Sequence, residues 1–190
     1  MTRFGSRTRD LGVPVGHHPR RYRWVKFGAM DEVLVVNLAH APAIGHPRMA
    51  GFIKLEPEGV VWADTGINVQ IMSPGEPNGR YHSEPDQEDF LVLYGECSAI
   101  LEGEERLLRQ WDFLHCPAGT GHVFVGAGDG PCAVLMIGAR RENVCHYTVN
   151  EVAAKYDASV SQETEEPAQA YADWLAETPP APMRNPWPLG

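Results

Sequence analysis

Two short segments contain side chains that could bind a metal ion or act as general acids and bases. One reads Tyr-His-Ser-Glu-Pro-Asp-Gln-Glu and includes His82, Glu84 and Glu88, and the other reads Pro-Ala-Gly-Thr-Gly-His and ends at His122. Because successive side chains of a strand point to opposite faces, His82 and Glu84 share a face if their segment is extended. Pro85 predicts a bend after which Glu88 returns on the next strand. Two imidazoles with one or two carboxylates can hold a divalent metal ion.

Short apolar runs between turn residues must position these side chains. Glycine and proline number 19 and 16 of 190 residues, so turns are frequent. Strand-length runs at this spacing predict an all-β sandwich or barrel, and the firmest hairpin lies between Glu96 and Leu108, around Gly103. The expected strands are Val33–Leu38, Gly51–Leu55, Val69–Met72, Phe90–Tyr94, Ser98–Leu101, Arg106–Leu108, Phe113–Cys116, Val123–Val125 and Cys132–Ile137.

Composition divides the chain into three expected parts. These are a basic, irregular N-terminal arm (residues 1–30), a β-barrel (residues 31–147) and a helical, Pro-rich C-terminal extension (residues 148–190). In the extension, Asn150 is a suitable N-cap for a helix at Glu151–Tyr156. Pro167 suits the first turn of a second helix that ends near Glu177. The tail after that helix is expected to be extended, with Trp187 as a packing anchor.

The charge distribution limits the classes of partner. The net charge is −9, yet residues 1–30 hold seven basic residues against one acidic residue. An acidic body disfavours nucleic acid and anionic membranes as main partners. No apolar run approaches the roughly 18 residues that span a membrane. The expected partner is therefore a small-molecule ligand, with no membrane and with nucleic acid disfavoured. The terminal extensions, which often exchange between subunits, add a second copy of the chain as an expected partner.

The four cysteines predict a reducing compartment. Cys97, Cys116, Cys132 and Cys145 have no CxxC spacing and lie in or beside apolar stretches. Such residues are typical of buried free thiols in a cytoplasmic protein.

The two chemical segments resemble the two motifs of the cupin superfamily, G-x5-H-x-H-x3-4-E-x6-G and G-x5-P-x-G-x2-H-x3-N. The intervals inside each motif are intact over about residues 65–140. Through the stretch Gln-Glu-Asp-Phe-Leu-Val-Leu at residues 87–93, the chain also looks like a group of small, single-domain bacterial cupins. The residues that match the two superfamily motifs are His82, Glu88, Gly95, Pro117, Gly119 and His122. The departures are Glu76 and Trp111 at the two leading glycines, Glu84 at the second histidine and Gly126 at the closing asparagine.

The resemblance implies a cupin-type antiparallel β-sandwich, or jelly-roll barrel, that is often a homodimer with a metal ion inside. The implied ligands are His82, Glu84, Glu88 and His122. The implied cofactor is one divalent ion per chain, Mn, Fe or Zn.

Three interpretations of Glu84 remain open at this point. In the first, Glu84 is a fourth ligand, and two carboxylates formally neutralise the ion. In the second, Glu84 lies beside an ion held by His82, Glu88 and His122. In the third, no metal binds and Glu84 is a general acid or base in an apolar pocket. Among the neighbouring residues, Arg80 is expected to be a surface charge and Cys116 a core residue.

The leading functional hypothesis is a metal-binding cupin that binds or transforms a small polar or anionic molecule, with the ion as a Lewis acid. A metal-dependent dioxygenase, isomerase or decarboxylase fits this description. The alternative is a binding or sensory cupin without turnover, with or without metal, because the fold hosts both classes.

Overall fold

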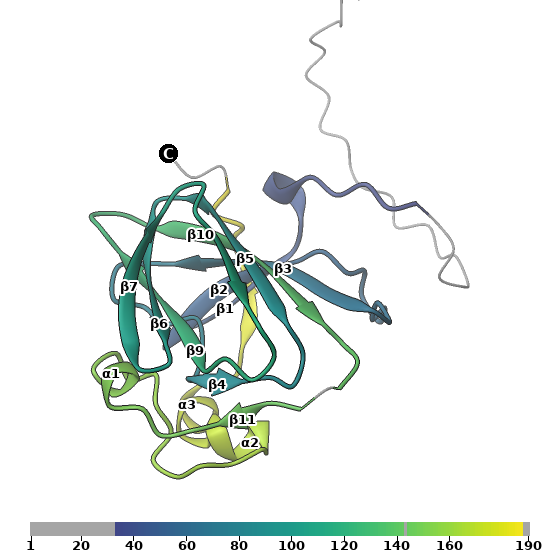
Figure 1. Ribbon diagram of the computed structural model, residues 1–190. Helices are drawn as coiled ribbons and strands as arrows, with labels where there is room; N and C mark the ends of the chain where they lie inside the picture. Colours follow the sequence, from purple (N-terminus) through teal and green to yellow (C-terminus); the bar gives the residue numbers. More distant parts are fainter. Residues whose placement is uncertain (1–32, 143, 188–190) are drawn as a thin grey trace, which may run out of the picture. The chain divides into compact units, whose positions relative to one another are not determined.

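The chain folds into two antiparallel sheets that face each other, as a computed structural model of residues 33–142 and 144–187 shows (Figure 1). The larger sheet has the order β12-β1-β2-β3-β10-β5-β8, and the smaller has the order β11-β4-β9-β6-β7. The first six strands are β1 (Ala43–His46), β2 (Met49–Lys54), β3 (Thr65–Met72), β4 (His82–Ser83), β5 (Glu88–Tyr94) and β6 (Glu96–Leu101). The others are β7 (Glu104–Arg109), β8 (Phe113–Cys116), β9 (His122–Ala127), β10 (Cys132–Ala139), β11 (His146–Tyr147) and β12 (Ala181–Met183). The expected all-β jelly-roll is confirmed.

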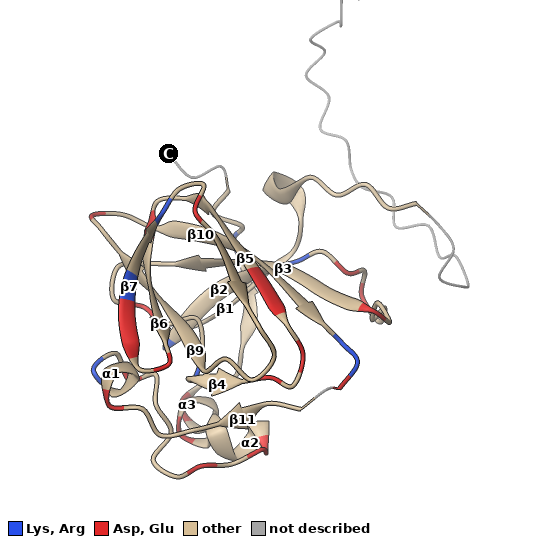
Figure 2. Ribbon diagram, viewed as in Figure 1, with Lys and Arg blue, Asp and Glu red and all other residues tan. Residues whose placement is uncertain are grey.

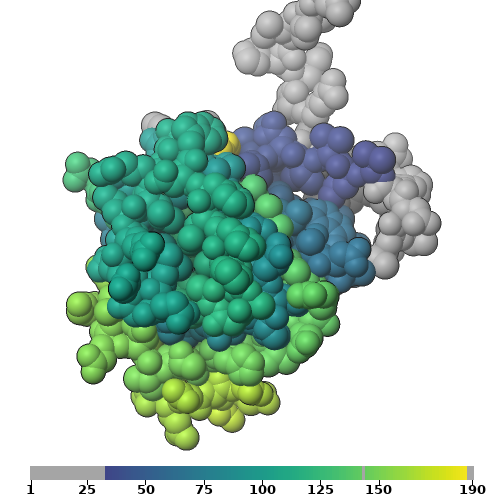
Figure 3. Space-filling view, in the orientation of Figure 1, coloured from purple at the N-terminus to yellow at the C-terminus, as the bar shows by residue number. Residues whose placement is uncertain are grey.

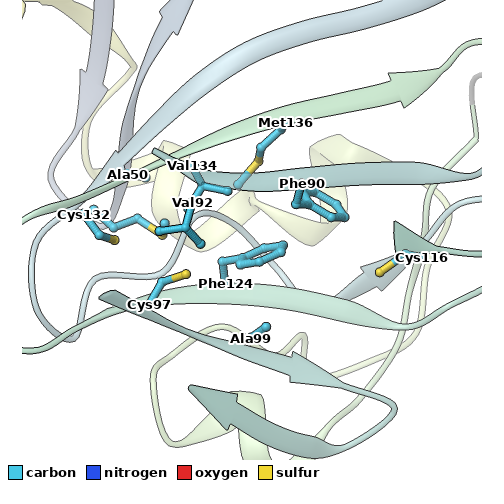
Figure 4. Packing of buried hydrophobic residues seen from close by; sticks show 11 residues of the cluster. Ala50, Phe90, Val92, Cys97, Ala99, Cys116, Phe124, Cys132, Val134 and Met136 are labelled. Atoms are coloured by element: carbon cyan, nitrogen blue, oxygen red, sulfur yellow. The ribbon is translucent and has the colours of Figure 1, made fainter. Parts of the chain in front are cut away.

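The main core lies between the two sheets (Figure 4). Phe90 and Val92 of β5 and Val134 of β10 face Cys97 of β6 and Phe124 of β9 across this layer. The ring centroids of Phe90 and Phe124 are 4.6 Å apart. Because His122 lies two residues before Phe124 on β9, strand alternation points its side chain into the same layer.

A second apolar layer covers the outer face of the larger sheet. Ile53, Val69 and Ile71 pack there against Leu38 and Trp187. Strands covered on both faces are apolar at odd and even positions alike, as the sequence indicated. The expected anchoring of Trp187 is confirmed, and β12 pairs with β1 of the same chain.

The C-terminal extension contains three short helices, α1 (Glu151–Ala154), α2 (Pro167–Ala170) and α3 (Ala172–Glu177). Asn150 caps α1, because its side-chain oxygen accepts from the N–H groups of Val152 and Ala153. The single helix expected from Pro167 to Glu177 is instead two helices, because Tyr171 has φ −108° and ψ 9°. Figure 3 shows this yellow-green segment packed against the green strands at the lower edge of the barrel.

One expected strand is wrong and four strands were missed. Val33–Leu38 makes no strand; Val33 and Val35 are exposed, and the segment leads into a 3-10 turn at Leu38–His40. Val36 and Leu38 still pack on the outer face of the larger sheet, so their apolar character reflects packing without strand pairing. The missed strands are β1, β4, β11 and β12, each of at most four residues.

The basic arm, residues 1–30, lies outside the described residues, and the boundaries 31–147 and 148–190 remain proposals. None of the helices in the described part of the chain combines the length and apolar character needed to cross a lipid bilayer.

Steric crowding explains the glycines at two motif positions. Gly95 has φ +68°, and a Cβ there would lie 2.5 Å from the carbonyl oxygen of Pro131. At Gly126, which replaces the closing asparagine, a Cβ would overlap the carbonyl oxygen of Ser73. The departure at Gly126 therefore fits a close approach of two backbone segments.

Replacing Gly95 with alanine is expected to lower the free energy of unfolding by roughly 2 kcal/mol or more, since left-handed strain and a backbone clash add. Denaturant unfolding measures the change. Gly130→Ala is the matched control, because a Cβ at Gly130 meets nothing within 4 Å. Equal effects of the two substitutions would contradict the steric account of Gly95.

Candidate metal centre

Strands β4 and β9 bring the two predicted histidines together. His82 and His122 are paired residues in the antiparallel register of these strands. Their ring centroids are 4.8 Å apart. The His122 side chain is 2% exposed and the His82 side chain 16% exposed, so His82 lies nearer the surface than His122.

Backbone hydrogen bonds fix which nitrogen of each ring faces inward. Nδ1 of His82 lies 2.8 Å from the carbonyl oxygen of Arg80, and Nδ1 of His122 lies 3.0 Å from that of Thr120. A carbonyl oxygen only accepts, so each Nδ1 carries the proton and donates. In the neutral ring the lone pair is then on Nε2, which is the arrangement that metal-binding histidines use.

Glu88 supplies a carboxylate to this pair from the first position of β5. Its Oε2 lies 3.2 Å from Nε2 of His122. The ligand atoms of His82, Glu88 and His122 all lie within 4.8 Å of one another. Burial, reinforced by the negative charge of Glu84, raises the pKa of Glu88 to about 7.

The contact between Glu88 and His122 tests whether this site fits a metal ion. The Nε2 lone pair and an ionised carboxylate oxygen are both acceptors, so they repel at 3.2 Å unless a cation or a proton lies between them. Burial lowers the pKa of His122 to about 4 and raises that of Glu88 to about 7, so without a cation the shared proton belongs to the Glu88 carboxyl and not to the imidazole. Two imidazole nitrogens and one carboxylate oxygen are a donor set for borderline divalent ions, and the residues present therefore fit.

Glu84 belongs to a neighbouring group instead of closing a four-residue cluster. Its Oε1 lies 3.7 Å from Nε2 of His82 and accepts a hydrogen bond of 3.4 Å from Sγ of Cys145. The ligand atoms of His82, Glu84 and Cys145 lie within 4.8 Å of one another. The four predicted residues thus lie in two groups that share His82.

The charges of this second group offset its burial. Burial raises the pKa of Glu84, but the hydrogen bond and charge of His82 together with the Cys145 thiol outweigh it, and the net pKa is lowered. Burial lowers the pKa of His82, yet Glu84, the Arg80 carbonyl and Glu88 raise it more. Figure 2 shows acidic colour at the start of β5, which begins with Glu88 and Asp89.

Cys145 is the residue that sequence analysis missed. It is half-buried and free, and β11, which follows it directly, pairs with β4 so that Tyr147 lies opposite His82. A two-residue strand leaves no periodic signal, and Cys145 has no motif spacing. Its proximity to Glu84 is therefore visible only in the fold. Cys116, by contrast, is confirmed as a core residue.

Arg80 is buried, so its expected role as a surface charge is wrong. Its side chain is 4% exposed and lies 4.0 Å over the ring of Trp174. The guanidinium donates to the carbonyl oxygens of Asp157, Ser159 and Ala170 and to both carboxylate oxygens of Asp173. Arg80 therefore anchors the C-terminal extension through its side chain and His82 through its backbone carbonyl.

Two surface hollows lie away from these groups. One of about 410 Å³ is lined by Arg48 and Asp157, and another of about 330 Å³ by Lys54, Asn68 and Arg140. Neither hollow is lined by any of the four predicted ligands. The side chain of Glu84 is 22% exposed, more than those of the other three, so a small molecule would approach from its side.

Comparison with known proteins agrees with this geometry. Residues 68–138 match the family model for the cupin domain, and this range contains all four predicted ligands. The chain therefore contains a cupin domain. No curated protein matches this cupin in a sequence search.

The fold is similar to that of several solved structures. The polyketide cyclase RemF from Streptomyces resistomycificus is 18% identical over 60% of this cupin and 84% of that chain, with a TM-score of 0.51. A predicted oxalate decarboxylase from Thermotoga maritima is 18% identical over 56% of this cupin and 98% of that chain, with a TM-score of 0.49. A cupin-like protein, also from Thermotoga maritima, is 16% identical over 63% and 90% of the two chains, with a TM-score of 0.49.

Proposed function

We propose that this cupin is a metal-dependent protein that binds and transforms a small polar or anionic molecule. His82, Glu88 and His122 hold one divalent ion, and Glu84 lies at the open side of the same centre. The observation that carries the proposal is the contact between the Nε2 lone pair of His122 and the carboxylate of Glu88, 3.2 Å apart. That pair needs a shared cation or proton, and three converging donors provide for a cation.

Three protein ligands leave coordination positions for a second molecule. A divalent ion bound there supplies Lewis-acid chemistry toward a carbonyl, carboxylate or enolate oxygen. Phe90 excludes water from the inner side of the metal centre, because its ring centroid lies 5.3 Å from that of His122. Glu84 lies where a molecule enters, and we assign to it the role of holding or moving a proton on that molecule.

The substrate classes that fit are small oxygen-rich acids. An anionic oxygen is attracted to a divalent ion, whereas the chain as a whole, with net charge −9, repels large polyanions such as nucleic acid. Isomerisation, decarboxylation and dioxygen insertion all suit this arrangement. We propose that the protein is a homodimer and acts in the cytoplasm.

Ligand-dependent thermal stability tests this function. The manganese- or iron-loaded protein is screened against small hydroxy acids, keto acids and sugar phosphates, and every hit is then checked for products with and without oxygen. We expect a stabilising acid that is converted by the loaded wild type and not by His82→Ala/His122→Ala. Stabilisation without conversion would point to a sensory cupin, and equal conversion by the double variant would contradict a role for the metal.

A further inference from the structure

We propose that Cys145, Glu84 and His82 form a second, thiolate-containing metal position that cannot be occupied together with the first. This inference rests on the proposed metal centre and extends it to a residue outside the cupin motifs. It predicts that softer ions bind at one side of His82 and harder ions at the other.

The geometry of Cys145 supports a ligand role. Its Sγ lies 3.4 Å from Oε1 of Glu84, whose Oε1 in turn lies 3.7 Å from Nε2 of His82. One nitrogen, one oxygen and one sulfur atom thus lie within 4.8 Å of one another, from three different chain segments. The other three cysteines are buried in the core, whereas Cys145 is only half-buried. An ion that enters beside Glu84 meets this group before it meets His122.

The two positions compete because they share one lone pair. Nδ1 of His82 carries its proton toward the Arg80 carbonyl, so Nε2 holds the ring's only free lone pair. That lone pair can be given either to an ion beside Glu88 and His122 or to an ion beside Glu84 and Cys145. The stoichiometry therefore stays at one ion per chain, whichever position is filled.

The two donor sets prefer different ions. Two imidazoles and a carboxylate suit Mn²⁺ and Fe²⁺, whereas a thiolate shifts preference toward Zn²⁺, Co²⁺ and Cd²⁺. When the metal–sulfur bond forms, the Cys145 thiol releases its proton to solvent. Cys145 would thus make the choice of ion depend on whether its thiol is free.

Cadmium loading tests the inference by a thiolate signal instead of activity. We expect one Cd²⁺ per chain and an ultraviolet sulfur-to-cadmium charge-transfer band in the wild type. The band is lost in Cys145→Ser, and it persists in Cys116→Ala, which removes a core thiol, and in Glu88→Gln, which changes only the first position. Added Mn²⁺ displaces Cd²⁺ one for one, with total metal constant at one ion per chain.

Each failure has a distinct meaning. A bound Cd²⁺ without the band, a band that survives Cys145→Ser, or two ions per chain at once would overturn this inference and leave the proposed metal centre intact. If neither Mn²⁺ nor Cd²⁺ binds, both the metal centre and the second position are wrong.

Discussion

Replacing Arg80 with methionine is expected to lower the free energy of unfolding by about 3 kcal/mol or more, because three carbonyl oxygens lose their donor and each unsatisfied buried acceptor costs roughly 1–3 kcal/mol. The guanidinium is 4% exposed and satisfies three carbonyl oxygens, those of Asp157, Ser159 and Ala170. Methionine fills the volume over Trp174 but donates to none of them. Chemical denaturation measures the loss, and limited proteolysis should then cut between residues 157 and 173.

The control removes charge from the same contact without removing the buried donors. Asp173 is 57% exposed, so Asp173→Asn is expected to cost about 1 kcal/mol or less. A loss as large as that of Arg80→Met would show that the ion pair, not the three carbonyl bonds, holds the C-terminal extension.

Metal affinity is expected to fall about tenfold for each pH unit below 7, or roughly 100-fold from pH 7 to pH 5. The pKa of Glu88 is raised to about 7 by burial, so below that pH the carboxyl is protonated in the metal-free chain. Only the ionised carboxylate binds the metal, so metal binding below pH 7 releases the proton of Glu88. Above pH 7 the carboxylate is already ionised and the affinity levels off.

The two histidines also affect the pH dependence of metal affinity. The pKa of His122 is lowered to about 4 by burial, so His122 stays neutral over this range. The pKa of His82 is raised by Glu84, the Arg80 carbonyl and Glu88 despite burial, so its protonation steepens the fall. Calorimetric titration with Mn²⁺ in buffers of different ionisation enthalpy reports both affinity and proton release. Affinity independent of pH from 5 to 7 would contradict a Glu88 ligand, and Glu88→Gln should bind weakly with a shallower slope.

The fold could be predicted from the sequence because the sequence signals for its elements are local. The Glu96–Leu108 hairpin is confirmed, with Glu102 and Gly103 at φ +51° and +81°, and so is the cap at Asn150. The spacing of the two motifs also brought His82, Glu88 and His122 into one group. Each of these features depends on a few neighbouring residues and on strand alternation.

The rest depended on contacts between distant segments. Arg80 looks like any charged residue before a tyrosine, and its burial comes from a helix more than 90 residues later. Cys145 meets Glu84 only because two-residue strands pair, and such strands have no period to read. The separation of Glu84 from Glu88 into different groups likewise follows from side-chain directions beyond Pro85, which the spacing alone left open.

Metal content is the most direct test of the central claim that His82, Glu88 and His122 hold an ion. Plasma mass spectrometry is done on tag-free wild-type protein purified without chelator, on His82→Ala/His122→Ala, and on His115→Ala, whose exposed ring pairs with Asp89 away from the centre. We expect about one ion per chain in the wild type and in His115→Ala, and none in the double variant. Full metal content in the double variant, or none in the wild type even after anaerobic reconstitution with Mn²⁺, Fe²⁺, Ni²⁺ and Zn²⁺, would contradict it.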